Sequence, residues 1–296
     1  MSVGGIEAGG TRWNCAVSGD GESLDRIESF PTTTPAETLA RAVEFFAADP
    51  DLEALGVGAF GPVEVDPDSP RRGTITTTPK PGWRDTDVVT PLADALGVPI
   101  ALDTDVDAAA IGEWRQGAAR GLDTFAYVTV GTGIGGGVFA AGRPVHGLLH
   151  PEFGHVRVPH DRARDPFEGS CPFHGDCLEG LASGTAMRER WGVPAEELTD
   201  PEAWDLEAEY LALGLSNLAL VVSAERIVLG GGVGRVPGLV PRVRTRLREV
   251  LAGYIDRPQL GEEIDAYLVP PGLGERSALV GAIHLAGQVS RGRGRR

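Results

Sequence analysis

The chain has 296 residues, and 42 acidic against 27 basic side chains give a formal net charge of −15. Hydrophobic residues make up 42% and charged residues 23%, which is typical of a globular protein with a full core. The acidic charge argues against nucleic acid and against an anionic membrane surface as partners. With three cysteines, no apolar run long enough for a membrane span and no secretion signal, we expect a cytoplasmic protein without a disulfide scaffold.

Strands and helices alternate along the chain. The first predicted elements are strands at 3–6 and 13–17, a helix at 35–48, a strand at 55–60, a helix at 91–96, a strand at 100–102 and a helix at 106–114. The pattern then restarts with strands at 125–130 and 135–141, a helix at 206–224, a strand at 226–229, a helix at 236–251, a strand at 264–269 and a helix at 277–289. This alternation predicts an α/β fold with mainly parallel strands and some hairpins.

Three glycine-rich turns follow predicted strands. They are Glu7-Ala8-Gly9-Gly10-Thr11, the run 131–137 and Gly230-Gly231-Gly232-Val233-Gly234. Glycine lets backbone N–H groups approach an anion closely, and a helix N-terminus adds favourable charge to the third turn. Glu7 could hold a hydrated Mg²⁺. A strand, a small-residue turn with threonine and a second strand occur twice, so we expect two half-sites that face one ligand. For each turn alone, an ordinary tight loop stays an alternative.

Three carboxylates lie in Asp103-Thr104-Asp105-Val106-Asp107, between a strand and a helix. One of them could orient an attacking hydroxyl and accept its proton, and Asp105 is our candidate. We expect the helix N-terminus to keep Asp105 ionised. N-capping of the helix by Thr104 or Asp105 is the structural alternative.

The most specific pattern is His155 followed by Cys171, His174 and Cys177. Two cysteines and a histidine at three-residue spacing, closed by a second histidine, predict a structural zinc site with no open position. Glu152 and Glu179 flank this set and could accept hydroxyl hydrogen bonds from a substrate, while His155 could also face it through its second ring nitrogen. We interpret Cys15 as a core residue, and the other four histidines as surface or core groups.

Together these residues resemble the ROK family of sugar kinases, within the actin-like ATPase superfamily. The likeness covers nearly the whole chain. Its most specific stretches are 58–62, 77–83, 150–155 and 177–184, which resemble the family's bacterial fructokinases. The resemblance implies an actin-like (ribonuclease H-like) fold with two lobes and an interlobe cleft. It implies an N-terminal lobe at 1–115, a C-terminal lobe at 116–276, and a closing helix at 277–296 that packs back on the N-terminal lobe and ends in a basic tail.

The resemblance also implies transfer of the ATP γ-phosphate to the 6-hydroxyl of D-fructose, with Mg²⁺ and Zn²⁺ as cofactors and a homodimer as the assembly. Asp105 would be the base. The nucleotide and Mg²⁺ contacts would be Glu7, Gly9, Gly10, Thr11, Arg12, Thr132, Gly133, Thr185, Gly230, Gly231, Gly232, Val233 and Gly234. The sugar contacts would be Gly61, Pro62, Thr104, Asp105, Glu152, His155 and Glu179.

Three positions depart from the family pattern. Arg12 stands where lysine is usual, Thr185 where proline is frequent, and Asp107 where asparagine is usual; Asp107 could raise the pKa of Asp105 by like-charge repulsion. A family kinase for glucose, mannose or an N-acyl hexosamine stays an alternative, because epimers differ by one hydroxyl. A non-enzymatic sugar-responsive binding protein is the alternative from another class. The family's regulators carry an added N-terminal helix-turn-helix, whereas here the phosphate loop begins at Glu7.

Overall fold

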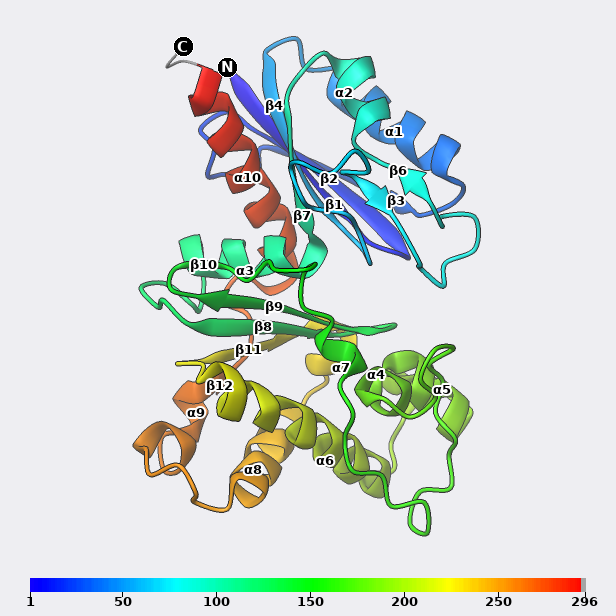
Figure 1. Cartoon of the computed structure of the whole chain (residues 1–296), viewed down its shortest axis with the longest axis vertical. Coiled ribbons are helices and arrows are strands. Elements are labelled where there is room, and N and C mark those ends of the chain that lie inside the picture. Colours follow the sequence, from blue (N-terminus) through cyan, green and yellow to red (C-terminus); the bar gives the residue numbers. More distant parts are fainter. Residues whose placement is uncertain (294–296) are drawn as a thin grey trace. The chain divides into compact units, whose positions relative to one another are not determined.

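A computed structural model describes residues 1–293, with side chains through Ser290, and divides into two compact units (Figure 1). The first unit contains residues 1–120, 146–150 and 275 onward, and the second contains 121–145 and 151–274. The basic tail expected at the end of the closing helix lies, after Ser290, outside the residues whose side chains are described. No helix in the described part of the chain is both long and apolar enough to cross a membrane.

The first unit is built on a five-stranded sheet in the order β3-β2-β1-β4-β7. Its strands are β1 (Ser2–Ala8), β2 (Arg12–Ser18), β3 (Arg26–Pro31), β4 (Leu52–Ala59) and β7 (Ile100–Thr104). The first three strands form antiparallel pairs, and β4 and β7 continue the sheet in parallel with β1. A small separate ribbon pairs β5 (Thr74–Ile75) with β6 (Thr86–Asp87).

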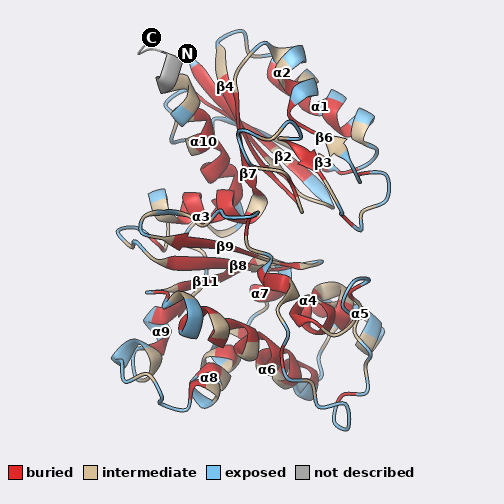
Figure 2. Cartoon of the chain, viewed as in Figure 1, coloured by how far each residue is buried: buried red, intermediate tan, exposed pale blue. Residues whose placement is uncertain are grey.

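Helices cover both faces of this sheet, which is why β1 and β4 are buried along nearly their whole length (Figure 2). Aromatic and aliphatic side chains of α1 (Pro35–Ala47) and α2 (Thr90–Leu96) join one core with the sheet. On the other side, α10 (Ser277–Arg293) packs against β1, β4 and α3 (Asp105–Gln116). This packing is unusually close: an added Cβ at Gly281 would lie 1.7 Å from the carbonyl oxygen of Ala108.

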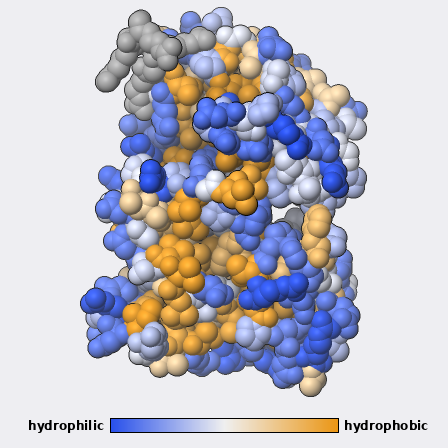
Figure 3. All heavy atoms as spheres, viewed as in Figure 1, coloured by the Kyte–Doolittle hydropathy of each residue, from blue (hydrophilic) through white to orange (hydrophobic). Residues whose placement is uncertain are grey.

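The second unit repeats the topology of the first, with the strand order β10-β9-β8-β11-β12. Its strands are β8 (Phe125–Val130), β9 (Ile134–Ala140), β10 (Arg143–Pro144), β11 (Ile227–Gly230) and β12 (Leu268–Val269). Again a hairpin comes first and two parallel strands follow. Its helices are α4 (Leu178–Ala182), α5 (Gly184–Trp191), α6 (Pro201–Asn217), α7 (Gly231–Gly234), α8 (Leu239–Leu251) and α9 (Ile264–Tyr267). The sheet shares one core with α6 and α8, and apolar side chains also gather on the face of this unit drawn in Figure 3.

Most predicted elements are present with ends shifted by a few residues, and one is wrong. The strand predicted at 264–269 is the short helix α9 followed by the two-residue strand β12. Helix 206–224 begins earlier, at Pro201, where Asp200 caps it, and ends in a π-helical turn at Leu218–Val222. The short helices α4 and α5 were not predicted.

Candidate active site and metal centre

Parallel pairing brings three chain segments to one edge of the first sheet. Gly58 of β4 lies opposite Glu7 of β1 on one side and opposite Asp103 of β7 on the other. The Glu7 carboxylate accepts a hydrogen bond of 2.7 Å from the side-chain amide of Asn14 on β2. An added Cβ at Gly58 would lie 2.6 Å from Cβ of Ala108. Glycine at this position therefore lets the first turn of α3 lie directly against the sheet edge.

Asp105 is the first residue of α3, at this same edge. The cap of the helix is Thr104, whose hydroxyl accepts from the backbone N–H of Asp107 at 3.0 Å, so Asp105 does not serve as the cap. Burial, and then the nearby negative charge of Glu7, raise the pKa of Asp105 to about 7. From the sequence we expect the helix N-terminus to keep Asp105 ionised; instead, loss of water outweighs the helix dipole, and Asp105 is only partly ionised at neutral pH. The negative charge that helps to raise the pKa of Asp105 is that of Glu7, and not that of Asp107 as the sequence suggested.

His146, which was not predicted as a site residue, contacts the carboxylates of Asp103 and Asp107. Nε2 of His146 lies 3.0 Å from Oδ1 of Asp103 and 3.4 Å from Oδ2 of Asp107. Both aspartates are buried, at 4% and 0% exposure. Hydrogen bonds to the two carboxylates raise the pKa of His146 to about 10, so its ring is cationic at neutral pH. His146 thus supplies the positive charge that two buried carboxylates require.

The first glycine turn joins β1 to β2. The N–H of Gly9 donates to the carbonyl of Arg12 at 3.0 Å, and an added Cβ at Gly9 would lie 2.8 Å from that carbonyl oxygen. Thr11 and Arg12 are exposed, and the Arg12 guanidinium donates to the hydroxyl of Ser29. The turn is tight and leaves Gly10 partly exposed, as an anion-binding turn requires.

In the second unit, the other two glycine motifs converge with the start of α5. The N–H of Gly184 donates to the carbonyl of Gly131 at 2.7 Å, and an added Cβ at Gly184 would also lie 3.3 Å from Val233. The Thr185 hydroxyl donates to the carbonyl of Thr132 at 2.8 Å. Gly231 has φ +85° and packs against the end of β8, a conformation and a proximity that favour glycine. The candidate nucleotide residues of this unit are therefore neighbours, although they come from three distant parts of the chain.

Glu179 of α4 follows the predicted metal ligand Cys177 by two residues and contacts the glycine turn between β8 and β9. Its carboxylate accepts from the N–H of Ile134 at 2.9 Å, and an added Cβ at Gly133 would lie 2.6 Å from it. Glu179 is partly buried, whereas Glu152 is exposed. In the first unit, Gly61 lies beside His150, whose Nε2 accepts from the N–H of Val63 at 3.2 Å.

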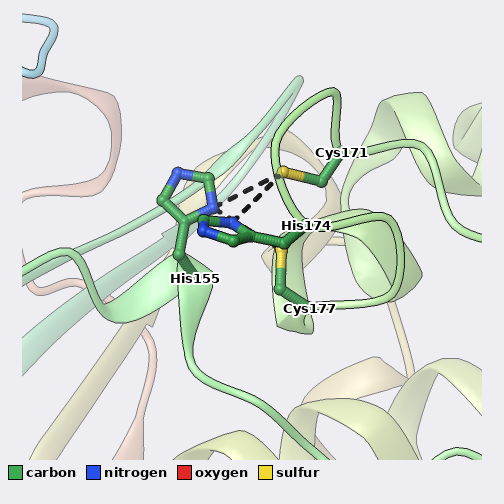
Figure 4. A group of neighbouring side chains, drawn as sticks. All are labelled: His155, Cys171, His174 and Cys177. Atoms are coloured by element: carbon green, nitrogen blue, oxygen red, sulfur yellow. Dashed lines mark hydrogen bonds between the residues drawn. The ribbon is translucent and has the colours of Figure 1, made fainter. Parts of the chain in front are cut away.

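The four predicted metal ligands lie together in the second unit (Figure 4). Their donor atoms are all within 4.8 Å of one another. Sγ of Cys171 lies 3.7 Å from Nδ1 of His155 and 3.6 Å from Nδ1 of His174, and Sγ of Cys177 lies 3.5 Å from Nδ1 of His155. A tetrahedral zinc ion with ordinary bond lengths requires sulfur and nitrogen ligands about 3.5 Å apart. The set therefore fits zinc, and it leaves Nε2 of His155 outside the ligand cluster.

Cys15 is fully buried in the core of the first unit, and burial raises the pKa of its thiol well above the usual range. This matches the interpretation as a core residue. Among the histidines set aside as surface or core groups, His146 alone binds two buried carboxylates. No local spacing could have revealed this, because its partners lie 43 and 39 residues away.

Each unit has the same strand order, with an initial hairpin and then parallel strands, and in both a glycine-containing turn joins the two strands of the hairpin. This duplicated arrangement is the actin-like ATPase fold. The model of the ROK family matches residues 3–289, and the chain belongs to that family.

Three relatives illustrate the likeness. A fructokinase from Zymomonas mobilis is 46% identical over 295 residues, which cover 96% of this chain and 95% of the relative. The ROK hexokinase from Thermus thermophilus superposes with a TM-score of 0.78 at 31% identity, covering 99% of this chain and all of that chain. A ROK family glucokinase from Streptomyces griseus, in complex with glucose and AMPPNP, has a TM-score of 0.79 at 27% identity, covering 97% of this chain and all of that chain.

Proposed function

We propose that the protein is an ATP-dependent fructokinase that transfers the γ-phosphate of ATP to the 6-hydroxyl of D-fructose. The observation that carries the proposal is Asp105, a partly exposed carboxylate at the edge of the first sheet with a pKa near neutrality. Such a group can accept the hydroxyl proton as the sugar oxygen bonds to the γ-phosphorus and the bond to ADP breaks. The high identity with the Z. mobilis fructokinase supports fructose as the acceptor.

In this proposal the nucleotide is held by the converging loops of the second unit and by the turn after β1. ATP would be contacted by Thr132, Gly133, Thr185 and residues 230–234. Its phosphates would be contacted by Gly9, Gly10, Thr11 and Arg12. The complex of the S. griseus glucokinase with AMPPNP supports a nucleotide site in this fold. Glu7 would hold hydrated Mg²⁺, which neutralises phosphate charge when bound; its carboxylate close to Asp105 fits a cation.

For the sugar, we propose contacts from Glu152, His155 and Glu179 in the second unit. The first unit would add Gly61, Pro62 and Thr104 beside the base. Zinc would be structural, since four protein ligands fill its coordination shell. It would fix His155 with Nε2 outside the ligand cluster, so that this nitrogen could meet a sugar hydroxyl.

We further propose a cytoplasmic homodimer. Cys171 and Cys177 lie in the four-residue set that fits zinc, and zinc binding by thiolates suits a reducing compartment. Leu220 and Val221, at the end of the α6 region, are 50% and 82% exposed. Such side chains are suited to an interface between two copies of the chain.

A coupled assay of ADP release over a hexose panel tests the substrate. We expect kcat/KM for fructose to exceed that for glucose, mannose and N-acetylmannosamine by at least about tenfold, a difference that one or two hydroxyl contacts can provide. A higher value for another hexose would replace fructokinase by the alternative kinase. Saturable sugar binding without ADP release from any hexose would favour the sugar-responsive binding protein.

A further inference from the structure

The segment 146–150 leaves the second unit after β10 and belongs to the first unit. Within these five residues, the N–H of Gly147 donates to the carbonyl of Leu149, and Leu148 is fully exposed at the bend. Both ends are histidines that bind the first unit. His146 meets Asp103 and Asp107, and His150 accepts from the N–H of Val63.

The two aspartates bound by His146 lie on either side of Asp105 in the sequence. Asp103 is near the end of β7, where its Oδ1 also accepts from the N–H of Thr104. Asp107 lies in the first turn of α3. One imidazole ring therefore joins the last residues of the strand to the first turn of the helix, and Asp105 occupies the point where they meet.

Asp107 depends on this ring for its charge. It is completely buried, and its Oδ1 has no hydrogen-bond partner in the described part of the chain. Burial and the charge of Asp103 raise its pKa, while the hydrogen bond to His146 lowers it. These two aspartates are the charged groups that act on His146, so removing the ring would leave two buried carboxylates without a cation.

We propose that His146 is a positioning residue for Asp105, holding the β7–α3 junction in its productive geometry by binding Asp103 and Asp107 together. The inference rests on the proposed function, since it assigns His146 a part in orienting the base. The arrangement depends on Asp107, because asparagine at that position would leave only one carboxylate for the ring to neutralise.

A double-mutant cycle tests this. The variants are His146→Gln, Asp107→Asn and the combination of both, with His284→Gln as a matched control on α10. We expect His146→Gln to lower kcat at least about tenfold, as displacement of a base can do, while KM for ATP changes less than about twofold. The double variant should have a kcat at least about threefold higher than that of His146→Gln, because Asp107→Asn removes the unpaired carboxylate. His284→Gln should turn over like the wild type.

Circular dichroism and thermal unfolding determine whether the variants are folded. The proposal is overturned if folded His146→Gln retains wild-type kcat, or if the double variant is no faster than His146→Gln. It is also overturned if a tightly bound metal ion beyond one zinc is lost with His146→Gln, because the three side chains would then be a ligand set. If His146→Gln is normal while Asp105→Asn is inactive, the proposed function stands without this inference; if the wild type phosphorylates no hexose, the proposed function itself fails.

Discussion

Asp105→Asn separates the chemistry of the base from its effect on the fold. The amide has nearly the shape of the carboxylate but cannot accept a proton, so we expect kcat to fall at least about 10²-fold. The structure predicts a second, opposite effect, because the pKa of Asp105 is raised to about 7 by burial and by Glu7. The same substitution that removes turnover should make the folded state more stable.

The sign and size of the stability effect follow from linkage between protonation and folding. Asp105 binds its proton more tightly in the folded chain than in the unfolded chain, where the pKa is about 4. Its ionisation therefore costs stability as pH rises through the window from about 4 to about 7. Above that window the cost reaches at most about 4 kcal/mol, reduced by solvent because the side chain is not fully buried. Asparagine should recover much of this cost near pH 8.5 and little near pH 4.5.

Two measurements check the reasoning. Urea unfolding of wild type and Asp105→Asn near pH 4.5 and pH 8.5 gives the two stability differences. The pH profile of wild-type kcat/KM gives the pKa of the free base, and a value near 7 implies roughly a tenfold rise between about pH 6 and pH 8. Equal stability differences at both pH values, together with a flat profile, would refute the assignment of a raised pKa to Asp105. Near-normal turnover of the variant would refute its role as the base.

Three further predictions concern other parts of the chain. Removal of zinc by chelation, or Cys177→Ala, should raise KM for fructose, and metal analysis should find about one zinc per chain, whereas less than one per two chains would contradict the site. Glu207 is buried and burial raises its pKa well above the usual value, so Glu207→Gln should raise the midpoint of thermal unfolding near pH 8 and not near pH 4.5; an unchanged midpoint at both would contradict this. Gly281→Ala would place Cβ 1.7 Å from the carbonyl oxygen of Ala108 and should cost more than about 2 kcal/mol in urea unfolding. Gly261→Ala, where Cβ would meet only ordinary contacts at 3.8 Å or more, is the control and should cost much less.

Local patterns in the sequence were enough to find the parts of the site whose geometry is local. Cys171, His174 and Cys177 lie within seven residues, so their spacing already restricts how they can be arranged. Asp105 lies between a strand and a helix that hydrophobic periodicity identifies. The pKa of Asp105 could not be predicted in this way, since burial and Glu7 determine it through the sheet pairing of β1, β4 and β7.

The errors have physical causes of the same kind. Strand β3 was not predicted because it is a largely exposed edge strand that ends in Pro31. Residues 264–269 are a short apolar run whose period fits a strand or a helix equally well, and the chain uses it as one turn of helix and two residues of strand. His146 lies in a loop, and its importance comes only from a fold that brings it to Asp103 and Asp107.

Close backbone packing explains why Asp105 can lose part of its water and still be reactive. Gly58 lets the first turn of α3 touch the sheet edge, and Gly112 and Gly281 let α3 and α10 pack against each other at distances that a larger residue would not permit. Helix α3 is therefore packed closely along its length, and its first turn contains the carboxylates of Asp105 and Asp107. A single cationic ring, His146, then balances two of these charges and leaves the third, Asp105, with a pKa near neutrality. The glycines thus bear on the proposed chemistry indirectly: they bring α3 so close to the sheet that Asp105 loses water, and this loss of water is the main cause of its raised pKa.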